Sequence, residues 1–247
     1  MRPQLSADRF DAVLFDLDGV LTDTAAVHAR AWKTMFDEFL RGWAERHGQP
    51  FTPFSIDSDY KTYVDGKPRY DGVRSFLLAR GIELPEGDID DPPQMETVRG
   101  LGNRKNDLVN RLLDDEGVVR YEGSVRLVEQ LRDQGIKRAV VSSSKNCAAV
   151  LEAAGISDLF DTRIDGVVAA ERGLPGKPAP DTFLAAAADL GAPPGRAVVV
   201  EDAISGVQAG RAGGFGLVIG VDREGDPNAL RSNGADVVVS DLGELVV

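Results

Sequence analysis

Short runs of apolar residues recur along this chain, separated by longer stretches in which apolar and polar residues follow helical spacing. The runs are AVLFDL (12–17), RAVVSS (138–143), RAVVVED (196–202), GLVIGV (216–221) and a weaker ADVVVS (235–240). Uninterrupted apolar runs of this length are typical of strands that are buried on both faces of a parallel sheet. The pattern therefore predicts a parallel sheet whose first strand lies near the amino terminus.

Helix-like stretches lie between the later runs. They cover residues 124–134, 145–154, 179–190 and 203–212. Strands that alternate with helices of about ten residues indicate βαβ units and a doubly wound parallel sheet. In such sheets ligands bind beyond the carboxyl ends of the strands, so those strand ends are where chemistry is expected.

Residues 25–117 interrupt this rhythm, because no strand-like run occurs there. The spacing predicts helices over 25–47, 69–80 and 103–115, with turn-rich segments at 48–59 and 83–94. We therefore expect an α/β core made of residues 1–24 and 118–247, and an inserted all-helical cap at 25–117. An insertion directly after the first strand is expected to form a lid over that strand's end.

Composition narrows the class of protein. The 247 residues are 43% hydrophobic and carry a net charge of −12, without a basic run. Nucleic acid and anionic membranes are therefore poor partners, and an anionic substrate needs a local cluster of positive charge. Cys147 is the only cysteine, which excludes a disulfide framework and a cysteine-based zinc site. With no apolar leader and no run of 18 apolar residues, a soluble cytoplasmic protein is expected.

Two candidate motifs come at the ends of predicted strands. Asp16 and Asp18 end the first strand on the same side, and Gly19 permits a tight turn after them. The alternative for this acid pair is a solvated turn or a helix cap. The segment SSSKN (142–146) ends another strand and opens a helix, where hydroxyls and backbone N–H groups can bind an anion. Its alternative is a simple helix cap.

Two further motifs follow later in the chain. Lys177 lies in GKPAPD, a loop held by glycine and proline just before a helix, although a loop lysine is usually only solvated. Glu201 and Asp202 end an apolar strand, where acids are either helix caps or metal ligands.

The four motifs become informative together, because each ends a parallel strand or begins the next helix. All four are therefore expected at one edge of the sheet, where acids that offer only oxygen ligands suit Mg²⁺. With the charges partly neutralised, Asp16 is a competent nucleophile towards phosphorus. Lys177 and the Ser142 hydroxyl would stabilise the equatorial oxygens. Asp18 would protonate the leaving oxygen and later deprotonate the next acceptor.

The motifs DLDGVLTDT, Ser142, Lys177 and the pair at 201–202, in that order, resemble the four signature motifs of the haloacid dehalogenase superfamily. The resemblance covers essentially the whole chain. It implies a Rossmann-like core, Mg²⁺ dependence and an aspartyl-phosphate on Asp16. It also implies Mg²⁺ ligation by Asp16, the backbone carbonyl of Asp18 and Asp202, with Glu201 assisting. A dehalogenase proper is disfavoured, because those enzymes lack the aspartate that stands here as Asp18.

Within the superfamily the chain resembles the β-phosphoglucomutase family, through FDLDGVLTDTAAVHARAWK, RKND, SSSKN and KPAPD. The resemblance implies a small phosphorylated sugar as substrate and glucose 1,6-bisphosphate as intermediate and activator. It places Thr24 and His28 on the hinge and cap side of the site, and Lys105 as the cap lysine that reports substrate binding to the hinge. The residues implied for the non-transferring phosphate are Arg69, Ser144, Lys145 and Asn146.

The residue pattern of the cap agrees with this in one respect. His28 falls on the helical stripe of Trp32 and Met35, and Lys105 shares a face with Leu101 and Val109. A lone polar residue on an apolar face is usually a satisfied core group. Two of them on different lid helices favour a shared polar cleft.

Several alternatives stay open. The stretches 32–69 and 69–105 are longer than a compact mutase needs, which leaves the sugar open. A sugar-phosphate phosphatase would need only the Asp16 centre, with water as the acceptor. A receiver-like phosphorylation switch is disfavoured, because receivers are about half this length and have no helical lid. Phosphonate hydrolysis would need a Schiff-base lysine, for which Lys33, Lys61 and Lys67 are available. A monomer is expected.

Overall fold

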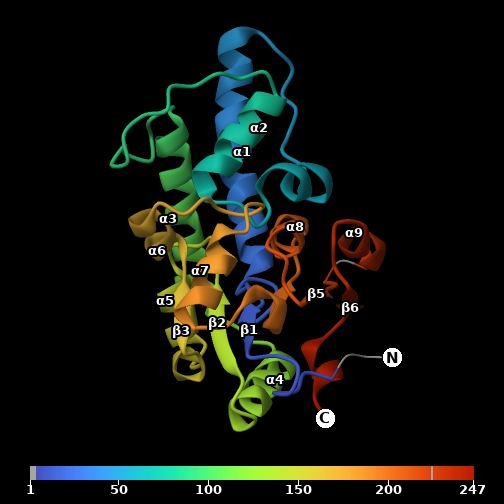
Figure 1. Cartoon of the computed structure of the whole chain (residues 1–247). Helices are drawn as coiled ribbons and strands as arrows, with labels where there is room; N and C mark the ends of the chain where they lie inside the picture. The colour runs from blue at the N-terminus through green and yellow to red at the C-terminus, as the bar shows by residue number, and fades with distance from the viewer. Residues whose placement is uncertain (1–3, 224) are drawn as a thin grey trace. The chain divides into compact units, whose positions relative to one another are not determined.

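The structure is a computed structural model that describes residues 4–223 and 225–247. The chain divides into two compact units. The first contains the chain up to Asp23 and again from Val118 onwards, and the second is Thr24–Gly117. Figure 1 shows the elements of both units.

Six parallel strands form one sheet in the first unit, in the order β3-β2-β1-β4-β5-β6. The strands are β1 (Ala12–Phe15), β2 (Lys137–Val141), β3 (Thr162–Ile164), β4 (Ala197–Glu201), β5 (Leu217–Val221) and β6 (Val237–Val239). The predicted parallel α/β sheet is confirmed, and its first strand lies between β2 and β4. Strand β3 was missed, because it has three residues and two of them are polar.

Helices pack on this sheet and connect its strands (Figure 1). They are α4 (Glu122–Asp133), α5 (Cys147–Ala153), α6 (Gly166–Arg172), α7 (Asp181–Asp189), α8 (Ile204–Ala212), α9 (Pro227–Ser232) and the 3₁₀ turns η2 (Ser157–Leu159), η3 (Pro194–Arg196) and η4 (Leu242–Leu245). Helix α7 covers β1, β2 and β3, and α8 covers β4 and β5. Phe183 of α7 is fully buried on this face with Leu14 and Val199. Burial of such a side chain contributes about 1.5–3 kcal/mol.

The described elements of the second unit are all helical. They are α1 (Ala25–His47), the π-helix η1 (Ile56–Val64), α2 (Arg69–Ala79) and α3 (Val98–Glu116). The first and third agree with the predicted helices. The predicted start of the last helix at 103 was wrong, because Thr97 caps the helix by accepting a hydrogen bond from Gly100 N–H at 2.9 Å. The prediction of turns through residue 59 was also wrong: polar residues mask η1, which buries Tyr60 and Val64.

Aromatic side chains form the centre of the second unit. Phe36 lies 4.2 Å from Phe76 and 5.1 Å from Phe54 between ring centroids, and Trp32 stacks on Phe36 at 5.3 Å. Offset and tilted ring pairs at such distances are favourable beyond the area they bury. This core holds α1 and α2 in a fixed arrangement.

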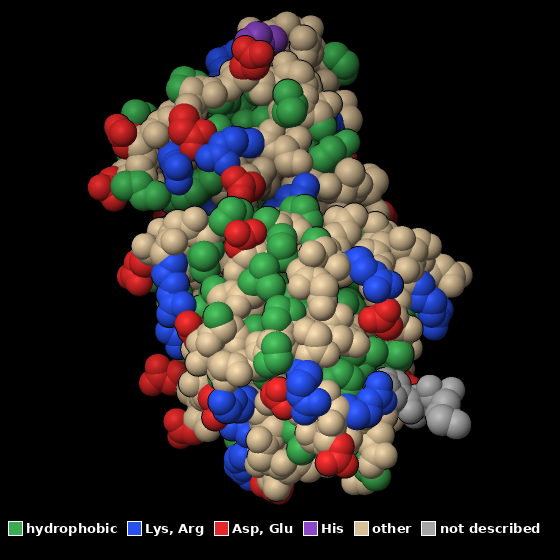
Figure 2. Space-filling view, in the orientation of Figure 1, with side chains coloured by type: hydrophobic (Ala, Val, Ile, Leu, Met, Phe, Trp, Pro, Cys, Tyr) green, Lys and Arg blue, Asp and Glu red, His purple; other side chains and the backbone are tan. Residues whose placement is uncertain are grey.

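On the face of the molecule drawn in Figure 2, acidic and basic side chains are interspersed rather than separated into one patch of each sign. Within the described ranges, the helices are all too short or too polar to cross a bilayer.

Candidate active site

The register of the central strands brings three chain positions to the same level. Phe15 of β1 is paired with Val140 of β2 and with Val200 of β4. The next residue on each strand is therefore at the carboxyl edge, and Asp16 N–H continues the ladder by donating to the Val200 carbonyl at 2.9 Å. Asp16 and Glu201 become neighbours because parallel strands in this register end together.

Lys177 joins the ends of all three strands. Its Nζ lies 2.5 Å from Asp16 Oδ1 and 2.5 Å from Glu201 Oε1, and it donates to the Val141 carbonyl at 3.0 Å. The ammonium therefore contacts one oxygen from the end of each of the three strands, with hydrogen bonds to Asp16 and Val141 and an ion pair with Glu201. The lysine side chain is 1% exposed, so this contact is shielded from solvent.

The charges of this cluster influence one another. Burial works against the charged form of Lys177, but Asp16 and Glu201 outweigh it and raise the pKa of the ammonium. Burial raises the pKa of Asp16 well above its ordinary value; the carboxylates of Glu201 and Asp18 act in the same direction and Lys177 opposes them. One ammonium between two buried carboxylates leaves a negative charge, which a cation at this edge would compensate.

The acidic side chains fit a hard cation. Asp16, Glu201 and Asp202 each offer a carboxylate oxygen, and these oxygens all lie within 4.8 Å of one another. An oxygen-only set of this size suits Mg²⁺, which keeps several waters and takes few carboxylates. The residues present therefore fit the metal that the sequence predicts.

Two glycines make room for these acids. A Cβ at Gly19 would lie 1.8 Å from Asp202 Oδ2, and a Cβ at Gly206 would lie 1.9 Å from the carboxyl carbon of Glu201. Any larger residue would therefore displace the carboxylate it faces. The role of Gly206 was missed from the sequence, although a glycine inside a helix is costly and often marks a close approach.

The loop after Asp16 is tightly turned. Gly19 has φ +83°, and its N–H donates to the Thr22 carbonyl at 2.8 Å. In a trans peptide the carbonyl points away from the N–H, so the carbonyl of Asp18 is directed away from Thr22. The Asp18 side chain is half-buried. This orientation is compatible with a backbone ligand at Asp18.

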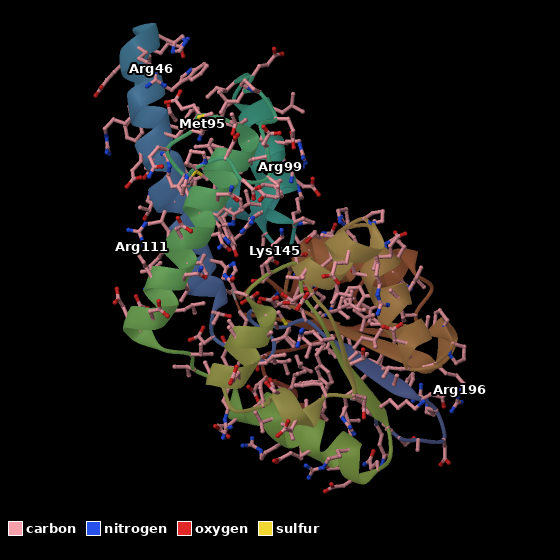
Figure 3. The ribbon with its side chains drawn as sticks, turned by 90° about the vertical axis from the view of Figure 1, so that its left-hand side faces the viewer. Arg46, Met95, Arg99, Arg111, Lys145 and Arg196 are labelled. Atoms are coloured by element: carbon pink, nitrogen blue, oxygen red, sulfur yellow. The ribbon has the colours of Figure 1, made fainter. Side chains whose placement is uncertain are left out.

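The serine motif lies in the loop between β2 and α5. Ser142 is buried, and its Oγ accepts from Ser144 N–H at 3.1 Å, while Ser144 Oγ accepts from Asn146 N–H at 3.1 Å. Figure 3 shows Lys145 in this loop, and Arg196 at the opposite edge of the sheet. The segment 142–146 is thus at the same sheet edge as Asp16, as the motif order predicts.

Two predicted site residues of the second unit contact each other. His28 Nδ1 and Lys105 Nζ are 2.9 Å apart, and the ammonium lies 5.0 Å from the ring centroid of Trp32. Lys105 is 6% exposed and Thr24, which precedes α1, is 1% exposed. The two polar positions on different helices therefore meet, in agreement with the prediction that they share a polar environment.

Arg69 begins α2 and is held by residues that the sequence did not single out. Its Nη2 donates to the Tyr70 hydroxyl at 2.9 Å, and that hydroxyl donates to Asn103 Oδ1 at 2.8 Å. The Tyr70 ring also contacts Arg99, whose Cζ is 4.2 Å from the ring centroid; Figure 3 labels this arginine. Arg69 Nε is buried and finds no partner among the described residues.

The fold and this strand-end cluster define a class of phosphoryl-transfer enzyme. The chain belongs to the haloacid dehalogenase-like hydrolase family, whose model matches residues 10–214. The β-phosphoglucomutase of Mycobacterium tuberculosis is 54% identical over 242 residues, covering 97% of this chain and 92% of that protein. Hexitol phosphatase A of Escherichia coli is 31% identical over 244 residues, covering 97% and 94%.

A solved structure agrees with the assignment. The β-phosphoglucomutase structure from Clostridium difficile superposes with a TM-score of 0.73 at 27% identity, covering 96% of this chain and 93% of the other. The resemblance to this superfamily and to its β-phosphoglucomutase-like branch is thereby confirmed.

Proposed function

We propose that the chain acts as a β-phosphoglucomutase, which interconverts β-D-glucose 1-phosphate and glucose 6-phosphate through the 1,6-bisphosphate. The observation that carries the proposal is the contact of Lys177 with both Asp16 and Glu201 at the carboxyl edge of the sheet. It occurs in a chain that is 54% identical to a protein named β-phosphoglucomutase.

Asp16 is the nucleophile in this proposal. Its carboxylate attacks phosphorus, a bond forms between the carboxylate oxygen and phosphorus, and the bond from phosphorus to the sugar oxygen breaks. Lys177 holds the Asp16 side chain by its Oδ1 contact at 2.5 Å, which orients the carboxylate for attack. The Ser142 hydroxyl donates to an oxygen of the transferring phosphoryl group.

Asp18 is the general acid and base. It donates its proton to the sugar oxygen that leaves, and in the second half-reaction it takes the proton of the hydroxyl that attacks the aspartyl-phosphate. The tight turn at Gly19 holds Asp18 two residues beyond the nucleophile.

Mg²⁺ would be held by Asp16, the Asp18 carbonyl and Asp202, with Glu201 assisting. When bound, the ion neutralises charge on the phosphoryl oxygens. The separations of no more than 4.8 Å among the carboxylate oxygens of Asp16, Glu201 and Asp202 support these three acids as ligands.

Substrate binding is assigned to both units. Arg69 of the second unit binds the phosphate that is not transferred, as do residues of the first unit: Ser144, Lys145 and Asn146. Thr24 and His28 mark the hinge and cap side, and Lys105, which contacts His28, reports substrate binding to the hinge. Glucose 1,6-bisphosphate is the activator.

The proposal also covers organisation and setting. Residues 1–24 and 118–247 act as the core and residues 25–117 as a cap that closes on the substrate. The chain works as a cytoplasmic monomer.

A sugar-phosphate phosphatase is the second candidate. Its support is the 31% identity to hexitol phosphatase A over nearly the whole chain. The chemistry at Asp16 is the same, and water replaces the sugar hydroxyl in the second step.

The deciding experiment separates the two products. β-D-glucose 1-phosphate is supplied with Mg²⁺ and a trace of glucose 1,6-bisphosphate, and glucose 6-phosphate and inorganic phosphate are followed separately. Glucose 6-phosphate with little inorganic phosphate is the expected result. Phosphate release without isomerisation would replace the mutase by the phosphatase.

Two variants connect the assay to the site. Asp16→Asn is expected to lower turnover by roughly 10⁴-fold or more, because the amide is not a nucleophile. Arg69→Ala is expected to slow isomerisation by roughly 100-fold and to leave hydrolysis of a small aryl phosphate nearly unchanged. Equal losses on both substrates would contradict the role of Arg69 at the second phosphate.

A further inference from the structure

Arg223 follows strand β5 and reaches the loop that carries Asp18. Its Nε donates to the Gly19 carbonyl at 2.7 Å, and its Nη1 donates to the Ser240 carbonyl at 3.1 Å. The arginine side chain is 19% exposed, and Asp241 lies 3.8 Å from Nη1. Arg223 therefore ties the residue next to Asp18 to the carboxyl-terminal segment of the chain.

The same guanidinium covers Tyr121. Its Cζ is 3.6 Å from the ring centroid, which is a close cation–π contact. The Tyr121 hydroxyl donates to Asp23 Oδ1 at 2.9 Å, and the backbone N–H of Tyr121 donates to the Leu21 carbonyl at 2.9 Å. Partial burial and then the hydrogen bond to Asp23 raise the pKa of Tyr121 to about 12, so the hydroxyl stays a donor. Tyr121 thus restrains the end of the loop, at Leu21 and Asp23, whereas Arg223 restrains its turn at Gly19.

Both peptide groups of Gly19 are restrained. Its N–H donates to the Thr22 carbonyl at 2.8 Å and its carbonyl accepts from Arg223. Rotation of the main chain at this position would break one of these two hydrogen bonds. The direction of the preceding residue, Asp18, is therefore set in part by a side chain more than 200 positions later in the sequence.

We propose that Arg223 and Tyr121 are positioning residues for Asp18. The inference rests on the proposed function, in which Asp18 is the general acid and base. Arg223 acts through the Gly19 carbonyl and Tyr121 acts through Asp23, and neither touches the reacting atoms. A displacement of a catalytic group by about 1 Å can cost roughly 100-fold in rate, so restraints on the main chain beside Asp18 can affect turnover.

The proton supplied by Asp18 provides a selective readout. As the bond between phosphorus and the leaving oxygen breaks, the electron pair stays on that oxygen and the Asp18 proton moves to it. A leaving group that is stable as an anion departs without this proton, whereas a poor leaving group needs it. Misplacement of Asp18 should therefore slow poor leaving groups much more than good ones.

The experiment is a single-turnover comparison with Mg²⁺ present. Release of p-nitrophenol from p-nitrophenyl phosphate is compared with release of phenol from phenyl phosphate. For Arg223→Met, phenol release should fall by roughly 10–100-fold and p-nitrophenol release by less than about threefold. Tyr121→Phe should give a smaller loss of the same kind. Arg223→Lys should restore part of the phenol rate, because an ammonium can donate to the Gly19 carbonyl.

Two further variants make the comparison interpretable. Asp18→Asn is the reference, and it should show the strongest dependence on the leaving group. Arg196→Met is the matched control: Arg196 also donates to two backbone carbonyls, those of Ala7 and Asp8 at 3.2 Å, but at the opposite edge of the sheet (Figure 3). It should leave both rates unchanged.

The outcomes separate the inference from the proposed function. Leaving-group dependence in Asp18→Asn but not in a folded Arg223→Met or Tyr121→Phe would overturn the inference and leave the function standing. Equal losses on both substrates in the Arg223 variants would also overturn it. Absence of the dependence in Asp18→Asn would overturn both. If Arg223→Met does not fold, Tyr121→Phe and Arg223→Lys decide the question.

Discussion

Gly206 determines how closely Glu201 can approach Lys177. The helix α8 passes beside the end of β4, and the missing side chain leaves the space that the Glu201 carboxylate occupies. The carboxylate is fully buried and its Oε1 lies 2.5 Å from Lys177 Nζ, so it has little room to move. At the residue scale the site therefore depends on the lack of a Cβ at Gly206 as well as on the acids themselves.

Gly206→Ala is expected to destabilise the protein by about 1–3 kcal/mol, because the new methyl group forces Glu201 away from Lys177. Helix propensity alone predicts the opposite, since alanine favours a helix over glycine by about 1 kcal/mol. Urea unfolding with and without Mg²⁺ measures the change, and turnover should fall with it.

Gly195→Ala is the matched control, because nothing lies within 4 Å of a Cβ built at Gly195. Its unfolding midpoint and turnover should stay close to those of the parent protein. A Gly206→Ala protein of unchanged stability and turnover would show that Glu201 does not need its present position.

At the scale of elements, the Tyr70 hydroxyl is one of the links between α2 and α3. Tyr70 of α2 bonds Arg69 on one side and Asn103 of α3 on the other. Asn103 Nδ2 in turn donates to the carbonyls of Ile89 and Asp91, at 3.0 and 2.9 Å. The long segment before α3, which exceeds what a compact mutase needs, is therefore tied to the arginine assigned to the second phosphate.

Tyr70→Phe should raise the KM for β-D-glucose 1-phosphate by roughly 5–10-fold, since it removes the hydroxyl that accepts from the Arg69 guanidinium and donates to Asn103. Its turnover of p-nitrophenyl phosphate, which has no second group for Arg69 to bind, should change little. Steady-state kinetics on the two substrates measure the split.

Tyr63→Phe provides the control for Tyr70→Phe. Tyr63 is a partly buried tyrosine of η1 that packs on the aromatic core of the same unit, with its ring centroid 6.1 Å from that of Phe76. It should leave the KM for the sugar phosphate unchanged. If both variants weaken sugar-phosphate binding equally, the link through Tyr70 has no special role.

For the molecule as a whole, the negative net charge opposes the binding of an anionic substrate unless a cation is also bound. The net charge is −12, and Lys177 already faces two carboxylates, so it offers little positive charge to an incoming phosphate. The cluster of Asp16, Glu201 and Asp202 instead brings three carboxylate oxygens within 4.8 Å of one another, an arrangement that suits a cation. In the proposed mechanism an anionic substrate would therefore depend on Mg²⁺ for its attraction to the core.

Mg²⁺ is expected to raise the thermal unfolding midpoint of the free protein. A ligand that binds only the folded state stabilises it by about 2.7 kcal/mol at a concentration 100 times its Kd. The increase should disappear in Asp202→Asn and remain in Asp158→Asn, an exposed acid in η2. A midpoint that does not respond to Mg²⁺ in the parent protein would argue against a resident site.

Much of the α/β core was predictable because its strands are marked by local patterns of apolar residues. An apolar run followed by acids places Asp16 and Asp202 at strand ends without knowledge of the fold, since parallel strands must be buried and their carboxyl ends must leave the sheet together. Helical spacing also placed His28 and Lys105 on the apolar faces of their helices, and the two side chains do meet. These inferences need only the spacing of side chains along one element.

The rest was decided by contacts between segments that are distant in the sequence. Strand β3 exists because it pairs with β2, although its own residues do not identify it. Nothing near Gly206 shows that Glu201 will lie against it, and nothing near Arg223 shows that it will bind Gly19. The sequence by itself determined the class of fold and the motifs of the site, because these follow from local periodicity and residue chemistry. Only the tertiary structure decided which side chains restrain those motifs, because close approach depends on how whole elements pack.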